Sequence, residues 1–342
     1  MTRRVAAVDC GTNSIRLLIA DVDPDLATLT DVDRRMEIVR LGQGVDTTGR
    51  LAPEALDRTL KALRGYAELI ADRGAGAVRM VATSATRDAA NADEFVRRVT
   101  EVLGTGPEVL TGDEEARLSF LGATAELDAS GPAPYLAPFL VADIGGGSTE
   151  FVLGADGQVA SALSVNIGCV RMTERHLRDD PPSAAQIAAA TADIDAAITR
   201  AAAVVDTTRA RTLVGLAGSV TTVAGIALDL PGYDPERLHH TRLSAAQVHE
   251  VATRLLAQTR AERARIPVMH PGRIDVIGGG ALILDRIMTQ LGLTEVLVSE
   301  HDILDGIAWS IAPPDPVRDS LPDRDSLADP VPDSLPDPAP EP

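Results

Sequence analysis

The 342-residue sequence predicts an α/β fold made of two related halves. Apolar strand-like segments alternate with amphipathic helical segments along the chain, which is typical of α/β layers. Glycine-containing turns follow several of these strands. One strand–turn–strand pattern occurs twice, near residue 10 and again near residue 145, which predicts a duplicated domain with a cleft between the copies.

The second copy of the pattern is the clearer one and spans residues 140–153. An apolar strand ends at Asp143, three glycines and Ser148 follow, and a second apolar strand begins. Glycines lack the Cβ atoms that keep a ligand away from the backbone, so their N–H groups can converge on a phosphate. Asp143 and Glu150 offer the oxygen ligands that Mg²⁺ prefers. Taken alone, the motif is equally compatible with a glycine hairpin whose acids are merely solvated.

The first copy spans residues 5–19 and has the same frame. Asp9 corresponds to Asp143, Gly11 to Gly145 and Ser14 to Ser148, with Thr12 and Asn13 inside the turn. We therefore expect two hairpins that face each other across a shared phosphate site.

Between the two copies, the pattern predicts a strand at 35–41, a helix from about 51 to 72 with Pro53 near its start, a strand at 78–83 and a helix at 92–103. Thr83 or Ser84 can cap a helix at the end of the 78–83 strand. This placement would bring N–H groups and Arg87 to the carboxyl end of a strand, where α/β proteins bind ligands.

A further helix is expected to begin near Gly112, with Asp113, Glu114 and Glu115 in its first turn. Acids at this end complement the helix dipole, which alone would account for them. One of them could also orient a water molecule as a general base. The residues themselves do not choose between these interpretations.

The loop 128–134 is the expected interdomain linker. A strand at 159–165 and a helix at 183–204 follow the second hairpin. Two later segments, 213–222 and 276–284, are each predicted as a strand, a glycine turn and a helix cap, so Gly218 and Ser219 become candidate phosphate ligands.

Composition narrows the function classes. No apolar run approaches the roughly 20 residues that cross a bilayer, so we expect a cytoplasmic protein without membrane contact. A formal net charge of −18 with a single lysine provides no basic surface for nucleic acid. The six histidines show no metal-ligand spacing, and Cys10 is interpreted as a small apolar filler. Beyond residue 312, ten prolines and eight acids in 30 residues predict a disordered acidic tail.

Several motifs in order make the chain resemble the exopolyphosphatase/guanosine pentaphosphate phosphohydrolase family, within the actin, sugar kinase and Hsp70 superfold. The resemblance rests on segments 9–17, 83–91, 112–116, 143–150, 168–171, 218–222, 278–280 and 305–306, and it covers residues 3–312. It is closest to the short two-domain form of actinobacteria. It implies an actin-like first domain (1–127), a second actin-like domain (128–312) whose last helix can pack on the first, an interdomain cleft and the separate tail (313–342).

The resemblance also implies roles for residues. Glu115 becomes the general base, with Glu114 as a neighbour of lesser claim, and Asp143 and Glu150, together with Asp9, become ligands of Mg²⁺. The expected phosphate-binding residues are Gly11, Thr12, Asn13, Ser14, Arg16, Ser84, Arg87, Gly145, Gly146, Gly147, Ser148, Thr149, Gly218 and Ser219.

The expected activity is hydrolysis of the terminal phosphoanhydride of inorganic polyphosphate. The runner-up substrate is pppGpp, and a kinase or ATPase of the same fold or a non-catalytic sensor are the remaining alternatives. A homodimer is expected from the family resemblance alone.

Overall fold

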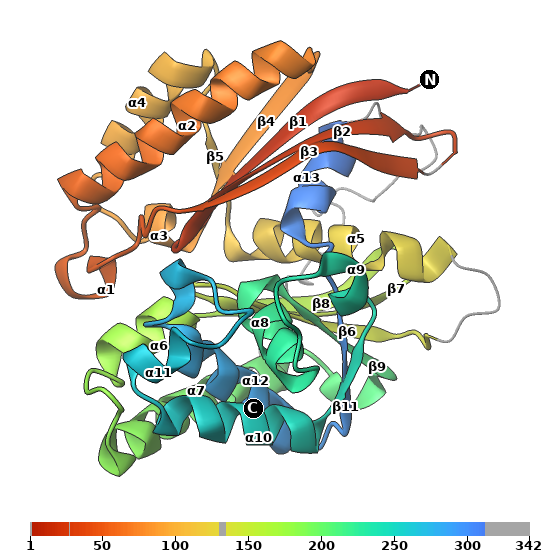
Figure 1. Cartoon of the computed structure of the whole chain (residues 1–342). Helices are drawn as coiled ribbons and strands as arrows, with labels where there is room; N and C mark the ends of the chain where they lie inside the picture. The colour runs from red at the N-terminus through yellow and green to blue at the C-terminus, as the bar shows by residue number, and fades with distance from the viewer. Residues whose placement is uncertain (1, 27, 130–134, 312–342) are drawn as a thin grey trace, which may run out of the picture. The chain divides into compact units, whose positions relative to one another are not determined.

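Two mixed β-sheets, one from each half of the chain, form the framework of the protein (Figure 1). The computed structural model describes residues 2–26, 28–129 and 135–311. The first sheet has the order β3-β2-β1-β4-β5 and consists of β1 (Arg3–Cys10), β2 (Ser14–Asp23), β3 (Thr28–Ile38), β4 (Ala77–Ala82) and β5 (Glu108–Val109). β2 and β3 run antiparallel to their neighbours, whereas β1, β4 and β5 are parallel.

The second sheet repeats this topology. It comprises β6 (Phe139–Ile144), β7 (Thr149–Ala155), β8 (Gln158–Val165), β9 (Thr212–Leu216), β10 (Arg242–Ser244) and β11 (Glu295–Val298). Its order β8-β7-β6-β9-β11 matches that of the first sheet strand for strand, and β10 adds one antiparallel edge. The expected duplication and the α/β class are therefore confirmed.

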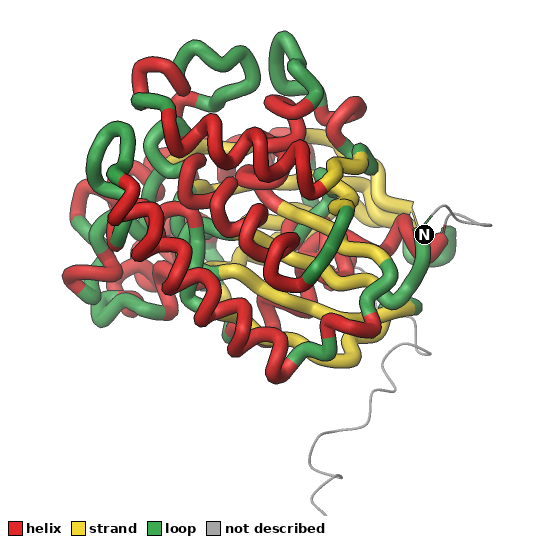
Figure 2. Tube along the Cα trace, turned by 90° about the horizontal axis from the view of Figure 1, so that it is seen from below, coloured by secondary structure: helices red, strands yellow, loops and turns green. Residues whose placement is uncertain are grey.

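The helices cover both sheets. They are α1 (Val45–Thr48), α2 (Pro53–Arg73), α3 (Ser84–Arg87), α4 (Ala92–Leu103), α5 (Gly112–Ala129), α6 (Cys169–Arg175), α7 (Ala184–Val204), α8 (Ala217–Ala227), α9 (Pro235–Leu238), α10 (Ala245–Ala257), α11 (Arg260–Arg263), α12 (Ile277–Leu291) and α13 (Ile303–Ile311). Figure 2 shows helices packed around the yellow strands. Within the described part of the chain, no helix is long and apolar enough to cross a bilayer.

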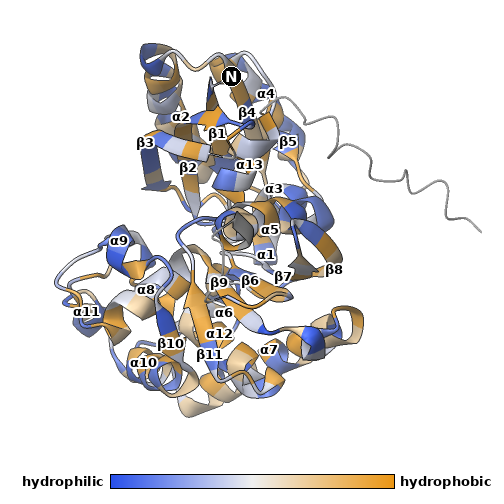
Figure 3. Cartoon of the chain, turned by 90° about the vertical axis from the view of Figure 1, so that its right-hand side faces the viewer, coloured by the Kyte–Doolittle hydropathy of each residue, from blue (hydrophilic) through white to orange (hydrophobic). Residues whose placement is uncertain are grey.

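Apolar residues of each sheet pack on helices at both faces. In the first sheet, one face packs on α2 and α4 through residues such as Leu60 and Phe95, and the other packs on α13 through Ile307. In the second sheet, one face packs on α7, α8, α10 and α12, and the other packs on α5 through Phe120. Figure 3 shows the orange of hydrophobic residues along these buried strands.

Helices α5 and α13 cross between the two sheets, and two glycines permit the crossing (Figure 1). A Cβ atom on Gly122 of α5 would lie 1.8 Å from the carbonyl oxygen of Asp302, and one on Gly306 of α13 would lie 2.0 Å from that of Leu118. No side chain fits at either position, so the two backbones approach directly. α5 therefore packs on the second sheet and α13 on the first.

Most expected elements occur within a few residues of their predicted bounds. The helix expected at 51–72 is α2, with Pro53 in its first turn, and the helix expected at 183–204 is α7, capped by Ser183. Thr83 occupies the N-cap position of α3, but its side chain makes no capping hydrogen bond. The strand expected at 35–41 overlaps the end of the longer β3, which stops at Ile38.

One expectation was wrong in detail, and another falls largely outside the described residues. The segment 276–284 is not a strand and glycine turn, because Ile277 already begins α12. Its glycines instead allow close helix packing, since a Cβ on Gly280 would lie 2.2 Å from Ser219 Oγ. In the expected linker 128–134, residues 128–129 end α5, and residues 130–134 lie outside the described part of the chain.

Candidate functional site

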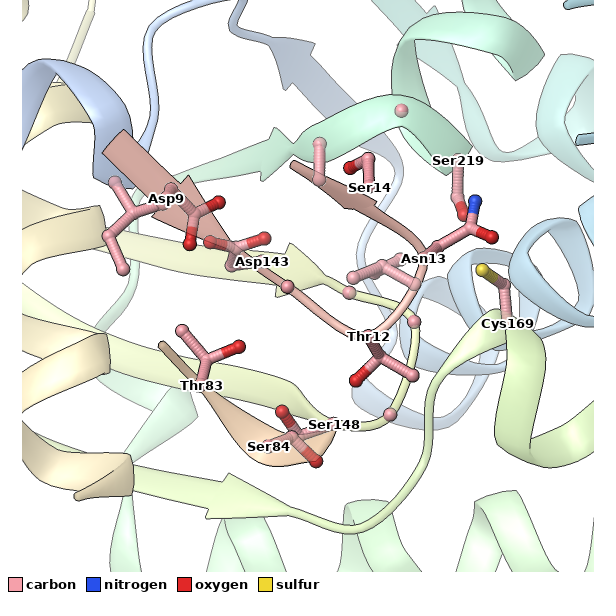
Figure 4. Close-up of a pocket in the computed structure, with 18 of the residues that line it drawn as sticks. Asp9, Thr12, Asn13, Ser14, Thr83, Ser84, Asp143, Ser148, Cys169 and Ser219 are labelled. Atoms are coloured by element: carbon pink, nitrogen blue, oxygen red, sulfur yellow. The ribbon is translucent and has the colours of Figure 1, made fainter. Parts of the chain in front are cut away.

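The two glycine turns face each other across a cavity of about 90 Å³ (Figure 4). In each turn the glycine N–H donates to a serine carbonyl, Gly11 to Ser14 at 2.9 Å and Gly145 to Ser148 at 3.0 Å. The turns are in contact, because a Cβ on Gly146 would lie 2.9 Å from Thr12 Cβ. The repeated sequence therefore produces two copies of one turn at a single site.

Buried carboxylates end the strands that lead into these turns. Asp9 pairs across its hairpin with Arg16, and Asp143 pairs with Glu150 at the equivalent position. Figure 4 shows Asp9 and Asp143 side by side. The two hairpins thus differ in the residue opposite the aspartate. The first hairpin has the cation Arg16 there, and the second has the carboxylate Glu150.

Each carboxylate is held by one specific partner. Arg16 donates to Asp9 Oδ2 from Nη2 at 2.6 Å, and it also pairs with Asp302. Ser119 Oγ of α5 donates to Asp143 Oδ2 at 2.6 Å. In the same way, Ser164 Oγ of β8 donates to Glu150 Oε1 at 2.6 Å. These hydrogen bonds fix the orientation of the acids.

Burial and mutual repulsion disfavour the charged forms of these acids. Burial, with the charge of Asp302, raises the pKa of Asp143 to about 6. Burial, with the charges of Glu115 and Asp143, raises the pKa of Glu150 well above its usual range. Burial also raises the pKa of Asp9, although Arg16 opposes the change. A group of buried acids with raised pKa values in a cleft is typical of functional sites.

Of the three acids in the first turn of α5, only Glu115 faces the cavity. Glu114 is exposed and accepts hydrogen bonds from the N–H and Oγ1 of Thr111, which makes it a helix-capping residue. Burial raises the pKa of Glu115 to about 7, although Arg87 at 3.1 Å opposes the change. The choice among the acids that the sequence left open therefore falls on Glu115.

The helices α8 and α12 begin at the cavity, and neither has a side-chain cap. Ala217, Gly218, Ser219 and Ile277 line the cavity at these two N-termini. Uncapped N–H groups and the helix dipole favour an anion there. Ala217 has a φ of 67°, which is uncommon for a residue other than glycine and marks strain at this site.

Sequence reasoning missed Arg273. Its guanidinium packs on Gly218, where a Cβ would lie 2.0 Å from Nη2. Among the described residues it has no carboxylate partner, and burial lowers its pKa. Arg273 lines both the small cavity and a larger neighbouring one of about 860 Å³, and Arg16 and Gly218 also line both. A half-buried cation that forms no ion pair is costly, so this position favours an anionic ligand. No local pattern marks Arg273, because it follows an ordinary Pro-Gly turn.

The structure brings together nearly all of the expected site residues. The cavity is lined by Asp9, Gly11, Thr12, Asn13, Ser14, Arg16, Ser84, Glu115, Asp143, Gly145, Gly146, Gly147, Ser148, Glu150, Gly218 and Ser219. Two expected phosphate ligands do not line it. Arg87 binds Glu115 and the carbonyl of Leu110 instead, and the hydroxyl of Thr149 donates to the carbonyl of Ile167.

The donor set fits a hard divalent cation. The candidate ligands are carboxylate oxygens of Asp9, Asp143 and Glu150, and Asp9 Oδ1 is buried without a hydrogen-bond partner among the described residues. Mg²⁺ prefers oxygen ligands, whereas softer metals prefer nitrogen or sulfur ligands. A cation there would also offset the repulsion that raises the pKa values of these acids.

Comparison with known proteins places this site in a family context. A sequence model of the Ppx/GppA phosphatase family matches residues 18–314. Exopolyphosphatase 2 of Mycobacterium tuberculosis is 51% identical over 320 residues, which cover 90% of this chain and 98% of that protein. A bifunctional 3-dehydroquinate synthase/phosphatase of Fusobacterium nucleatum is 33% identical over 88% of this chain and 45% of its own length.

Solved structures agree with these matches. The crystal structure of an exopolyphosphatase-like protein superposes with a TM-score of 0.87 at 45% identity, covering 91% of this chain and 98% of that one. The Ppx/GppA enzyme of Aquifex aeolicus gives a TM-score of 0.75 at 30% identity, covering 91% of this chain and all of that one. The matches extend over both sheets and the cleft between them, and the chain belongs to the Ppx/GppA phosphatase family.

Proposed function

We propose that this protein is an exopolyphosphatase that hydrolyses the terminal phosphoanhydride of inorganic polyphosphate and releases orthophosphate. The observation that carries the proposal is the single cavity at which two glycine turns, two uncapped helix N-termini and a set of buried carboxylates meet. The relative named exopolyphosphatase 2, at 51% identity, supports the same activity.

Backbone N–H groups within residues 12–14 and 146–148 bind the terminal phosphates in this proposal, since the N–H groups of Gly11 and Gly145 already donate within their turns. Arg16 and Arg273 offset the charge of the phosphates from the side of the larger cavity. Phosphoryl transfer depends mainly on placement and charge neutralisation, which these groups provide.

Glu115 acts as the general base. It lies in the first turn of α5 at the edge of the cavity, where its carboxylate can accept a proton from the attacking water. Arg87 fixes its orientation through Nη1 and thereby acts as a positioning residue rather than as a phosphate ligand. Ser119, one helical turn further along α5, orients Asp143.

Asp9, Asp143 and Glu150 hold a divalent cation, which we propose to be Mg²⁺. When bound, the cation neutralises charge on the phosphate oxygens. The chain's own contribution is to orient these carboxylates and to shield them from bulk water.

Phosphate release from short polyphosphate, long polyphosphate, pppGpp and ATP, with and without Mg²⁺, tests the proposal. We expect the fastest release from polyphosphate and loss of activity with EDTA. The Glu115→Gln variant should lose hydrolysis, whereas the matched Glu114→Gln variant should keep it. Transfer of labelled phosphate from ATP to an acceptor other than water would instead support a kinase.

The pentaphosphate pppGpp is the second candidate substrate, and the 860 Å³ cavity is the observation that favours it. This cavity opens beside the phosphate site and is lined in part by Met36, Tyr233 and Val268, which offer apolar surface for a nucleoside. A higher kcat/KM for pppGpp than for polyphosphate would reverse the order of the two substrates.

The family resemblance extends the proposal to a homodimer in the cytoplasm. Light scattering on the full-length protein measures the oligomeric state, and cell fractionation measures the location.

A further inference from the structure

A second group of metal-ligating side chains lies outside the phosphate cavity. Glu126 comes from the second half of α5, His239 follows α9, and His301 lies in the connection between β11 and α13. Glu126 Oε2 lies 3.2 Å from His239 Nε2, and Glu126 Oε1 lies 3.5 Å from His301 Nδ1. One ligand atom from each residue falls within 4.8 Å of the others. The three positions are far apart in sequence, so no spacing motif predicts them.

We infer that Glu126, His239 and His301 form a binding site for a divalent transition cation such as Zn²⁺. Two imidazole nitrogens and one carboxylate suit zinc, whereas Mg²⁺ prefers oxygen ligands only. Tetrahedral coordination with bonds of about 2.0–2.1 Å separates ligand atoms by about 3.3 Å. The two imidazole nitrogens lie 3.2 and 3.5 Å from the two different carboxylate oxygens of Glu126, which is close to that spacing, and one ligand atom from each residue lies within 4.8 Å of the others. The Glu126 side chain is 54% exposed, so water can complete the coordination.

The backbone around the two histidines holds the donors in place. His240 has a φ of 61°, and its N–H donates to the carbonyl of Val298 at 2.8 Å, which fixes the segment after His239 to β11. The His301 N–H donates to Ser299 Oγ, and that hydroxyl donates back to the His301 carbonyl. The ring centroids of His239 and His301 are 4.6 Å apart. The site is therefore largely formed before an ion arrives, which lowers the cost of binding.

Binding displaces two hydrogen bonds of His239. The Glu300 N–H donates to Nδ1 of His239 at 3.2 Å, so without metal the ring carries its proton on Nε2 and donates to Glu126. The ion takes the place of this proton, which moves to Nδ1, so the hydrogen bond from the Glu300 N–H is lost as well. Because of this change, metal binding is weaker here than at a site where a carbonyl oxygen accepts a hydrogen bond from the second ring nitrogen of the histidine. It also makes the ion and the Glu126–His239 hydrogen bond alternatives to each other.

The site is chemically and spatially distinct from the phosphate cavity. His239 and His301 line the 860 Å³ cavity, and Glu126 does not line the cavity of about 90 Å³. A bound ion would tie α5 to the β11–α13 connection at the rim of the larger cavity. The inference concerns binding alone, so it stands or falls separately from the proposed hydrolysis.

Titration of the full-length, tag-free protein with Co²⁺ in excess Mg²⁺ tests the inference. Mg²⁺ occupies the oxygen-ligand cleft, and the visible absorption of Co²⁺ reports four-coordinate binding with nitrogen ligands. We expect one equivalent to bind and to be displaced by Zn²⁺. Glu126→Gln and His301→Asn should each weaken Co²⁺ binding at least tenfold. His249→Asn is the matched control, because His249 pairs with Asp285 outside this cluster and its loss should leave binding unchanged.

Equal Co²⁺ affinity in the wild-type protein and the His301→Asn variant would overturn the inference, as would the absence of a four-coordinate Co²⁺ spectrum. Circular dichroism without metal verifies that the variants fold. The number of imidazole ligands can also be counted on the wild-type protein by pulsed electron paramagnetic resonance of bound Cu²⁺. Two imidazoles are expected, and none would contradict the site even if a variant failed to fold.

Discussion

Glu115, the proposed general base, is the residue at which stability and the proposed catalytic role oppose each other. It is only 8% exposed, and burial raises its pKa to about 7. A carboxyl group with a raised folded-state pKa contributes its full stability below its unfolded pKa of about 4.3, and that contribution is lost as pH rises through about 7. At pH 8 the protein therefore holds a buried carboxylate at a cost in folding free energy, and this charged form is the one that can accept a proton from water.

Glu115→Gln should separate these two effects. In metal-free buffer at pH 8 we expect the free energy of unfolding to rise by up to about 3 kcal/mol, and at pH 5 we expect a much smaller change. Phosphate release should fall at least about a hundredfold, because the amide cannot act as a base. Urea unfolding at both pH values measures the first effect. Equal changes in stability at pH 5 and pH 8 would contradict the assigned pKa.

Arg273 should govern substrate affinity more than the chemical step. Arg273→Gln removes a half-buried cation that forms no ion pair among the described residues, so we expect KM for polyphosphate to rise about tenfold or more, with a smaller change in kcat. Arg286→Gln is the matched control, since Arg286 pairs with Asp195 and lines neither cavity. An unchanged KM in Arg273→Gln would remove Arg273 from the proposed binding site.

At the scale of elements, the crossing of α5 and α13 affects both the stability of the fold and the position of Glu115. Both helices connect the two halves, and their glycines let the backbones touch. α5 also carries Ser119, which binds Asp143, so a shift of this helix moves both the base and a proposed metal ligand.

Gly122→Ala should therefore destabilise the protein and reduce activity together. The new Cβ would meet the Asp302 carbonyl at 1.8 Å, and we expect a loss of about 2–4 kcal/mol in unfolding free energy because backbone cannot move aside cheaply. Gly65→Ala in α2 is the control, since nothing lies within 4 Å of its Cβ and the change should stabilise by up to about 1 kcal/mol. Denaturant unfolding compares the two variants, and a neutral Gly122→Ala would contradict the crossing geometry.

Local patterns predict elements well when the signal lies within one element. Pro53 and Ser183 mark the helix starts that are found, and the repeated Asp-x-Gly frame predicts both hairpins. The same reasoning wrongly placed the three glycines at 278–280 in a turn. The sequence does not distinguish a glycine needed for close helix packing from one needed for a turn. Arg87 was expected to bind phosphate but contacts Glu115, a partner 28 residues away in sequence.

Long-range partners explain the rest of what the sequence could not predict. Asp302 reaches Arg16 across 286 residues, and Arg273 reaches the phosphate cavity from the β10–α12 region. Such contacts follow from the packing of the two halves and leave no periodic signal. The cluster of Glu126, His239 and His301 is invisible in sequence for the same reason.

At the scale of the whole molecule, the two halves contribute different side chains to the cleft. The first supplies Asp9, Arg16 and Glu115, and the second supplies Asp143 and Glu150. Ion pairs also join the halves beside the cleft, with Arg171 of α6 bound to Asp46 and Asp88. We propose two lobes, each centred on one sheet, with α13 assigned to the first lobe and α5 as the joint between them.

This charge distribution predicts how a divalent cation changes stability with pH. Burial raises the pKa of Asp143 to about 6 and that of Glu115 to about 7, so at pH 6 the cleft retains protons that an ion must displace. At pH 8 the acids are mostly ionised, their repulsion is greatest, and an ion that binds only the folded state stabilises it most. Saturating Mg²⁺ should therefore raise the melting temperature, relative to EDTA, by several degrees more at pH 8 than at pH 6.

Differential scanning calorimetry at the two pH values measures this difference. Asp143→Asn should abolish most of the Mg²⁺-dependent increase while it raises the melting temperature in EDTA at pH 8, because the amide removes one buried charge from the cluster. Asp285→Asn, at a similarly buried aspartate outside the cleft, should keep the full response. An Mg²⁺ effect that is larger at pH 6, or one that survives in Asp143→Asn, would show that the ion binds somewhere other than at the cleft carboxylates.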